Sequence, residues 1–244
     1  MDDQQITDKA IKQAKAMKKV IARKLVDHLP EEEEAASVFM AGSPGAGKTE
    51  AARAMVRVFK NEHDLTLVHI ENDELRKEFE DYQGYNSPLF QRPATILVEA
   101  IHDRALKRRV SFILDSTLSN FDKAKDNIER SLKKGRFVMI VFVYQEPVQA
   151  WRLVKARESV EGRRVPSEVF INQFLESQRV VSELKKLFRD QIDITFIEKN
   201  VDGDNKRPHF NVGDIDALLR KKYNRESLER IVGITRGGSH AEQA

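Results

Sequence analysis

The chain has 244 residues, no cysteine, 40% hydrophobic residues and a formal net charge of +3. This apolar content supports a packed core and excludes a wholly disordered chain, and the lack of cysteine excludes disulfides, thiolate zinc sites and thiol catalysis. The near balance of charge argues against a nucleic-acid partner, and the sequence shows neither a signal-peptide pattern nor an apolar run of membrane-spanning length. We therefore expect a cytoplasmic protein without a membrane partner.

Hydrophobic periodicity predicts strands that alternate with helices along the chain. A basic amphipathic helix is predicted at 1–30, and its polar face is interpreted as solvated. The five predicted strands are 37–42, 65–70, 110–114, 137–144 and 192–197. The other predicted helices are 50–56, 73–80, 89–109, 120–133, 146–157, 166–189, 213–222 and 225–232. Polar loops are expected at 81–88, 158–165 and 198–207, and a frayed tail at 237–244.

This alternation is typical of an α/β fold in which helices cover both faces of a parallel sheet. Together with the phosphate-binding motif described next, it predicts a P-loop NTPase fold, a three-layer sandwich like that of nucleoside and shikimate kinases, with a five-stranded parallel sheet. We expect an N-terminal helical extension at 1–34, the kinase core at 35–200, and a C-terminal helical extension with a tail at 201–244. Ligands of such folds bind beyond the carboxyl ends of the strands.

The most specific motif is G-x-x-x-x-G-K-[ST], which residues 42–49 match in full between a predicted strand and a predicted helix. Its glycines let backbone N–H groups surround phosphate oxygens, Lys48 is expected to reach the β- and γ-phosphates of ATP, and Thr49 to ligate Mg²⁺. A plain glycine turn is the alternative. The expected nucleotide-binding residues are Gly42, Ser43, Pro44, Gly45, Ala46, Gly47, Lys48 and Thr49.

Acidic residues follow two of the predicted strands, at the edge of the sheet that also carries the phosphate-binding loop. We expect Asp73 to accept the proton of an acceptor hydroxyl, and Asp115 to contact the acceptor or, with Thr49, Mg²⁺. The alternatives are a helix cap for Asp73 and a solvated loop position for Asp115. Glu71 has a weaker claim and is interpreted as a surface residue.

Arginines gather at the end of the helix predicted at 146–157 and in the loop that follows it. Arg157 and Arg163 are expected to neutralise the transferring phosphoryl group from a mobile lid near 157–166. A solvated basic loop is the alternative. The expected lining of an acceptor pocket is Tyr82, Tyr85, Asn86, Arg92 and Glu99.

These motifs resemble the zeta toxin family of P-loop kinases, which phosphorylate UDP-N-acetylglucosamine with ATP. The resemblance extends from about Val38 to Ile197, and it rests on residues 42–49, 70–73, 98–101, 113–117 and 163–166. It implies that Lys48 is the phosphate lysine, that Asp73 is the base for the sugar hydroxyl, and that Arg157 and Arg163 contact the ATP phosphates. The acceptor contacts that it implies are Asp73, Glu99, Asp115 and Thr117.

Two departures from the family pattern concern the acceptor. Asp115 stands where the family usually has Glu, and Ser116-Thr117-Leu118-Ser119 stands where it usually has Gly-Thr-Gly-Arg. The arginine that the family uses to bind the acceptor diphosphate is therefore missing. The family also implies a partner, either a small antitoxin that lays a helix over the ATP site or a comparable segment in cis, for which the helix at 6–29 is the candidate.

Four functions are compatible with the sequence. The first is a zeta-toxin-like kinase for a sugar-nucleotide hydroxyl, with UDP-N-acetylglucosamine as the expected acceptor. The second is a P-loop kinase for another hydroxyl, such as a nucleic-acid end, a nucleoside or an antibiotic. The third is an ATP-binding switch or ATPase that acts through a protein partner, and the fourth is a basic nucleic-acid-binding protein. We favour the first.

Overall fold

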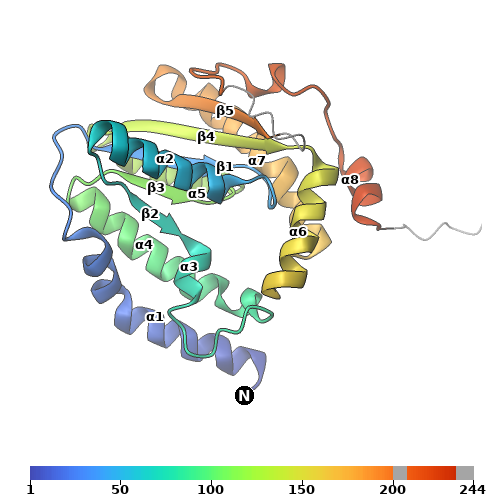
Figure 1. Ribbon diagram of the computed structural model, residues 1–244, viewed down its shortest axis with the longest axis horizontal. Helices are drawn as coiled ribbons and strands as arrows, with labels where there is room; N and C mark the ends of the chain where they lie inside the picture. Colours follow the sequence, from blue (N-terminus) through green and yellow to red (C-terminus); the bar gives the residue numbers. More distant parts are fainter. Residues whose placement is uncertain (200–207, 235–244) are drawn as a thin grey trace, which may run out of the picture.

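The computed structural model describes residues 1–199 and 208–234. Within them, five strands form one sheet in the order β2-β3-β1-β4-β5, and every neighbouring pair is parallel (Figure 1). The predicted five-stranded parallel sheet is thereby confirmed. The strands are β1 Ala36–Ala41, β2 Val68–Glu71, β3 Phe112–Asp115, β4 Phe137–Gln145 and β5 Asp193–Lys199. Most of the loop predicted at 198–207, and all of the tail predicted at 237–244, lie outside the described residues.

Helices follow each of the first four strands. The α-helices are α1 Asp3–Val26, α2 Lys48–His63, α3 Asn72–Arg76, α4 Gln91–Lys107, α5 Phe121–Leu132, α6 Pro147–Glu161, α7 Ser167–Phe188 and α8 Arg225–Val232. Short 3-10 helices are η1 Ser87–Phe90, η2 Arg189–Gln191 and η3 Ile215–Ala217. Among the described residues, no helix combines the length and the apolar character that crossing a membrane requires.

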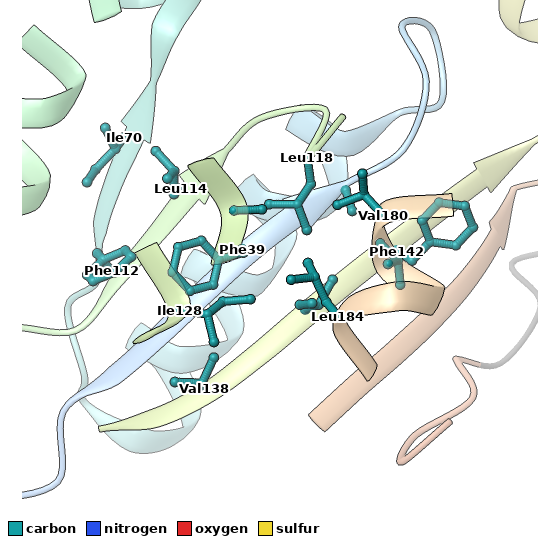
Figure 2. Packing of buried hydrophobic residues seen from close by; sticks show 14 of the residues in the cluster. Phe39, Ile70, Phe112, Leu114, Leu118, Ile128, Val138, Phe142, Val180 and Leu184 are labelled. Carbon is teal, nitrogen blue, oxygen red and sulfur yellow. The ribbon is translucent and has the colours of Figure 1, made fainter. Parts of the chain in front are cut away.

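Hydrophobic side chains cover both faces of the sheet, so successive residues of a strand enter two different buried layers. On one face, α2 packs against a cluster that includes Val38 and Met40 of β1. On the other face, α4, α5 and α7 pack against a larger cluster around Phe39 and Phe112 (Figure 2). The predicted three-layer sandwich follows from this double burial.

Helix α1 adds a layer outside α4 (Figure 1). Its predicted apolar side packs on the domain, with Ala14 and Ile21 buried. At its end, Asp27 accepts two hydrogen bonds from Arg104 of α4, each 2.6 Å long. The N-terminal helix is therefore part of the packed structure, on the side of α4 that faces away from the sheet.

The loop between α6 and α7 is shorter than the sequence indicates. The helix predicted at 146–157 continues to Glu161, because no helix breaker precedes Gly162. Gly162 then ends α6 with a φ of 68°, a left-handed conformation that glycine adopts without strain. The arginine-rich loop predicted at 158–165 is thus reduced to 162–166, which joins α6 to α7.

The prediction of a helix at 213–222 is wrong. Only Ile215–Ala217 forms a 3-10 turn, which the side chain of Asp214 caps. The apolar residues of this segment, Ile215 and Leu219, are buried in the main core. Their helix-like spacing therefore reflects anchoring of an irregular segment to the core rather than an amphipathic helix.

Arg136, in the turn between α5 and β4, joins the first residues of neighbouring strands. It is buried and donates hydrogen bonds to the hydroxyl of Ser37 at 2.7 Å, the carbonyl of Ala36 at 2.6 Å and the carbonyl of Val110 at 2.8 Å. Its guanidinium also lies 5.1 Å from the ring centroid of Phe112. This one side chain supplies donors to three oxygens at the start of the sheet.

We expect Arg136→Met to lower the free energy of unfolding by about 3 kcal/mol, because three oxygens lose their donors. Urea unfolding measures this. The matched control is Arg179→Met on α7, whose hydrogen bonds to Glu176 and Glu183 lie at the surface and whose loss costs less than about 1 kcal/mol. Equal losses in the two variants would contradict the role given to Arg136.

Candidate active site

A cavity of about 910 Å³ opens at the carboxyl ends of β2 and β3, beside the loop that follows β1. Its walls come from that loop and from α3, α4, α5 and the segment 162–166. Pockets for single small ligands have volumes of roughly 300–1,000 Å³. The cavity is therefore large enough for the phosphates of a nucleotide together with part of a second ligand.

The phosphate-binding loop runs very close to the backbone of β4 and α6. Gly42 and Gly45 have φ angles of 134° and 75°. A Cβ atom at Gly42 would lie 2.2 Å from the carbonyl oxygen of Val143, and one at Gly45 would lie 2.2 Å from that of Ala150. Both positions therefore require glycine, for conformation and for space.

Lys48 is the first residue of α2, and its side chain folds back along the loop. Its ammonium group donates a 2.8 Å hydrogen bond to the carbonyl oxygen of Ser43. Burial lowers the pKa of Lys48 to about 8, and Asp115 opposes this shift. An anion beside this ammonium group would also receive the free N–H groups at the start of α2.

Asp115 ends β3 beside the start of α2, where its carboxylate accepts a 2.7 Å hydrogen bond from the hydroxyl of Thr49. His69 Nε2 lies 3.8 Å from Asp115 Oδ2, and its Nδ1 lies 4.0 Å from Glu71 Oε2. Burial alone raises the pKa of Asp115, but His69, Lys48 and Thr49 together hold it below the usual value. Asp115 is thus a buried, ionised carboxylate and not a solvated loop residue.

The interpretation of Glu71 as a surface residue is wrong. Glu71 is the last residue of β2 and pairs in register with Asp115, which places its carboxylate in the sheet edge rather than in solvent. Burial raises the pKa of Glu71, while His69 and Arg53 oppose the rise. Arg53 donates a 3.2 Å hydrogen bond from Nη2 to Glu71 Oε2.

Two residue sets have the chemistry to ligate a metal ion. The hydroxyl of Thr49 and the carboxylate of Asp115 are adjacent oxygen ligands of the kind that Mg²⁺ prefers. His69, Glu71 and Asp115 also bring one ligand atom each within 4.8 Å of one another. Because Arg53 already engages Glu71, the pair Thr49 and Asp115 fits Mg²⁺ better.

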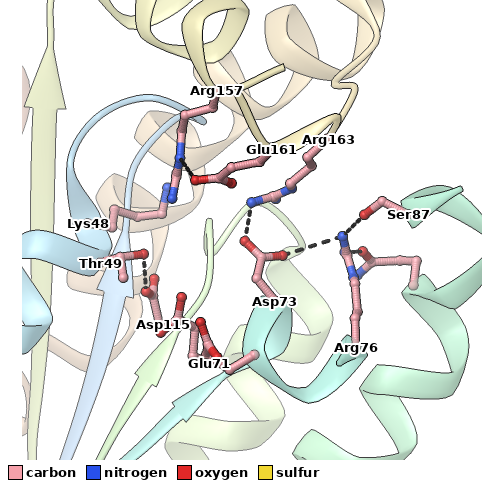
Figure 3. Close-up of polar contacts among 12 residues, drawn as sticks. Lys48, Thr49, Glu71, Asp73, Arg76, Ser87, Asp115, Arg157, Glu161 and Arg163 are labelled. Atoms are coloured by element: carbon pink, nitrogen blue, oxygen red, sulfur yellow. Dashed lines mark hydrogen bonds and ion pairs between the residues drawn. The ribbon is translucent and has the colours of Figure 1, made fainter. Parts of the chain in front are cut away.

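Asp73 lies in the first turn of α3 and faces the cavity between two arginines (Figure 3). Arg163 donates a hydrogen bond to Oδ2, and Arg76 lies 3.4 Å from Oδ1. The cap position of α3 belongs to Glu71 and carries no side-chain cap bond. The alternative in which Asp73 caps the helix is therefore wrong.

Arg157 on α6 lines the main cavity and also a neighbouring cavity of about 510 Å³ between the phosphate-binding loop and α6. Its Nε lies 3.7 Å from Glu161 Oε1. Arg164 is 75% exposed and lies at the rim, 4.0 Å from Glu158. Of the three arginines, Arg157 and Arg163 are thus the less exposed, as the sequence interpretation preferred.

The sequence profile of the zeta toxin family matches residues 21–207, most of the chain. The chain belongs to the zeta toxin family. This agrees with the motifs at 42–49, 70–73 and 113–117. No curated protein sequence matches the chain significantly.

Solved structures share the zeta toxin fold. A chain from the PezAT chromosomal toxin–antitoxin system of Streptococcus pneumoniae has a TM-score of 0.61 and 17% identity, with 96% of each chain covered. A chain of the AvrRxo1-ORF1:AvrRxo1-ORF2 complex has a TM-score of 0.58 and 14% identity, covering 93% of this chain and 72% of that one. A chain of the Pnkp1/Rnl/Hen1 RNA repair complex has a TM-score of 0.51 and 18% identity, covering 79% of this chain and 53% of that one.

The residues that the zeta toxin pattern implies for the acceptor meet in the main cavity. Glu99, Asp115 and Thr117 all line it. Glu99 accepts a 2.6 Å hydrogen bond from Lys123 of α5, and the Thr117 hydroxyl lies 2.8 Å from that of Ser119. Sequence positions that are far apart therefore form one wall.

The other predicted pocket residues are placed elsewhere. Tyr82, Tyr85, Asn86 and Arg92 line neither cavity described here. Tyr82 instead packs edge-on against Phe90, with ring centroids 5.5 Å apart. Within this loop, Asn86 accepts a hydrogen bond from the backbone of Gln83 and donates one to the carbonyl of Asp81, whereas Ser87 and Pro88 at its end line the main cavity.

Sequence reasoning missed several polar residues of the cavity, among them Arg76, Lys123 and Asn127. Arg76 is buried one helical turn after Asp73, and Lys123 and Asn127 follow the cap residue Asn120 on one side of α5. Oδ1 of Asn127 has no hydrogen-bond partner among the described residues. The spacing of Asn120, Lys123 and Asn127 could have indicated that these residues share one side of a helix. Only the fold shows that this side of α5 faces a cavity.

Helix α1 contributes no residue to either cavity. It lies behind α4, on the side away from the phosphate-binding loop (Figure 1). The alternative in which the N-terminal helix covers the ATP site in cis is therefore not supported by this arrangement.

We expect Gly45→Ala to lower the free energy of unfolding by about 3 kcal/mol or more, because the new Cβ meets backbone that cannot rotate away. The matched control is Gly47→Ala, where φ is also positive but the atoms near the new Cβ, the closest at 3.4 Å, belong to the flexible side chains of Lys199 and Glu50. Only the conformational cost of about 1–2 kcal/mol remains there. Urea unfolding compares the two, and equal losses would contradict the close approach to Ala150.

The lowered pKa of Lys48 predicts that the affinity for ATP falls above about pH 8. Bound phosphates favour the charged ammonium group and raise the pKa of Lys48. When ATP binds at a pH above the pKa of Lys48 in the free protein, Lys48 must therefore take up a proton. Calorimetry from about pH 7 to about pH 9.5, in buffers of different ionisation enthalpy, measures this uptake. Lys48→Met should abolish it, and a pH-independent affinity in the wild type would contradict the assignment.

Proposed function

We propose that the chain is an ATP-dependent kinase that transfers the γ-phosphate to a hydroxyl of a sugar nucleotide, with UDP-N-acetylglucosamine as the expected acceptor. The observation that carries this proposal is the shared cavity, in which Lys48 and Thr49 face Asp73. Family membership supports kinase chemistry, and the cytoplasm, where ATP is available, is the proposed compartment. The proposed organisation remains a kinase core at 35–200 between the extensions 1–34 and 201–244.

On the nucleotide side, the N–H groups of residues 42–49 would surround the phosphates, and the Lys48 ammonium would contact the β- and γ-phosphates. Arg157 and Arg163 would neutralise the charge that spreads over the γ-phosphoryl oxygens in the transition state. Thr49 and Asp115 would hold Mg²⁺, whose positive charge would offset that of the phosphates.

On the acceptor side, Asp73 would accept the proton of the attacking hydroxyl as its oxygen bonds to the γ-phosphorus. The bond from that phosphorus to the β–γ bridging oxygen breaks, and ADP leaves with the electron pair. Glu99, Asp115 and Thr117 line the acceptor wall and can accept hydrogen bonds from sugar hydroxyls. Catalysis here consists of positioning and charge neutralisation.

An anionic acceptor also has a partner in this wall. Lys123 lies in the first turn of α5, and the N-terminal end of that helix, with its cap residue Asn120, faces the same cavity. A helix N-terminus and an ammonium group both favour a phosphate. Lys123 is the side chain that we propose in place of the arginine missing from 116–119.

We also propose a small antitoxin as a protein partner. The support is the similarity to a chain from the PezAT toxin–antitoxin system. Since α1 leaves the cavity uncovered, a separate chain is the simpler candidate for controlling access to it. Co-purification of the chain with the product of a neighbouring gene tests this partner.

Phosphotransfer from ATP, followed by mass spectrometry, tests the proposed function. We expect UDP-N-acetylglucosamine to gain one phosphate with the wild type, and Lys48→Ala and Asp73→Asn to reduce the rate at least about a hundredfold. The control is Lys60→Ala, an exposed lysine of α2 that pairs with Asp64 and leaves the rate unchanged. A different phosphorylated product from a metabolite extract would support the kinase function but identify another acceptor. The absence of any product would contradict the proposal.

A further inference from the structure

The proposed base, Asp73, has each of its carboxylate oxygens beside a guanidinium group (Figure 3). Arg163 donates a hydrogen bond to Oδ2, and Arg76 lies 3.4 Å from Oδ1. The proposed reaction needs one of these oxygens to receive the proton of the acceptor hydroxyl. In the described arrangement, a hydroxyl that approached Oδ2 would have to compete with Arg163.

The two arginines are held in different ways. Arg76 is only 6% exposed and donates hydrogen bonds to Ser87 of η1 and Gln91 of α4, so three elements fix its guanidinium. Arg163 has a side chain that is 26% exposed, and among the described residues its polar partner is Asp73 alone. One arginine is thus built into the wall of the cavity, whereas the other is attached to the carboxylate alone.

The position of Arg163 in the chain favours movement. It follows Gly162, which ends α6 in a left-handed conformation, and it belongs to the short segment 162–166. It is also close enough to Lys48 for its charge to lower the pKa of that ammonium group. Arg163 therefore lies within reach of both the Asp73 carboxylate and the place proposed for the ATP phosphates.

We propose that Arg76 is a positioning residue that orients the Asp73 carboxylate, and that Arg163 occupies the second oxygen of this carboxylate only until ATP draws its guanidinium to the phosphates. This inference rests on the proposed kinase function. A triphosphate carries more negative charge than one carboxylate and offers bidentate oxygens to a guanidinium. The base is consequently free only when the phosphoryl donor is bound, so ATP promotes binding of the acceptor and the acceptor promotes binding of ATP.

A double-mutant cycle on ATP affinity tests the exchange. Calorimetry without acceptor measures the ATP affinity of the wild type, Asp73→Asn, Arg163→Ala and the double variant. If Arg163 must leave a carboxylate to reach ATP, Asp73→Asn tightens ATP binding by about fivefold, the size expected for a partly exposed ion pair. In the Arg163→Ala background the same change has less than about a twofold effect. An equal effect in both backgrounds would mean simple repulsion between Asp73 and ATP and would overturn the exchange.

The matched control is Arg164→Ala. Arg164 is the next residue in the same segment and lines the same cavity, but its ion pair is with Glu158 rather than Asp73. The fivefold effect of Asp73→Asn should persist in this background. Its disappearance there would show that the coupling is a general effect of lid charge, which would also overturn the exchange.

The phosphotransfer assay on the same proteins separates the two proposals. If the wild type binds ATP and transfers phosphate but the cycle shows no coupling between Asp73 and Arg163, the proposed function stands and the exchange is wrong. Failure of every variant to bind ATP removes both. If the cycle shows coupling but no phosphorylated product forms, Arg163 still moves when the nucleotide binds, and the proposed kinase function is wrong.

The role of Arg76 is tested through its anchor. Gln91→Ala removes one acceptor of the Arg76 guanidinium without touching Asp73, and we expect kcat to fall about tenfold with KM for ATP unchanged and the protein still fully folded under assay conditions. The control is Arg92→Ala, the next residue of α4, which is exposed and lines neither cavity. A fall in kcat that only follows the loss of folded protein, or that Arg92→Ala reproduces, would overturn positioning by Arg76.

Discussion

The site depends on the close approach of the phosphate-binding loop to the backbone that follows β4. At Gly42 and Gly45 the loop leaves no space for a Cβ atom beside the carbonyls of Val143 and Ala150. This contact fixes the direction in which the loop enters α2, and therefore the position of Lys48 and Thr49 at the start of that helix.

The strand order supplies the second part of the site. Because β3 lies between β1 and β2, Asp115 ends next to Thr49 on one side and pairs with Glu71 on the other. Asp73 then follows within one turn, across the cavity from the loop. Because these strands are parallel, their carboxyl ends lie at one edge of the sheet, where ligands of such folds bind.

Charged side chains of opposite sign lie close together in the cavity. Lys48, Arg157 and Arg163 face Asp73 and Asp115, so removing one charge changes the partner that another prefers. In such a network, the exchange that we propose for Arg163 would let an arriving triphosphate redistribute the arginines. A conformational response to the nucleotide would then lie in the side chains themselves and would not require a large movement of the segment 162–166.

The sequence by itself determined the class of fold, because apolar strands alternating with helices and the complete motif at 42–49 are local patterns with one physical solution. It also located Lys48, Asp73 and Asp115, since acids at strand ends converge in a parallel sheet. Local patterns were weaker where packing decides the conformation, as in the segment 213–222, which is anchored by Ile215 and Leu219 without forming a helix.

Only the tertiary structure decided which side chains meet. Several contacts of the site join residues from different elements, and no local spacing encodes them. Examples are the pairing of Glu71 with Asp115, the hydrogen bond of Arg76 to Gln91, and the pairing of Glu99 with Lys123. The same holds for Arg163, which the sequence assigns to a phosphate and the structure places on Asp73. Sequence patterns report the conformation of each segment, whereas the partner of a charged side chain depends on how the segments pack together.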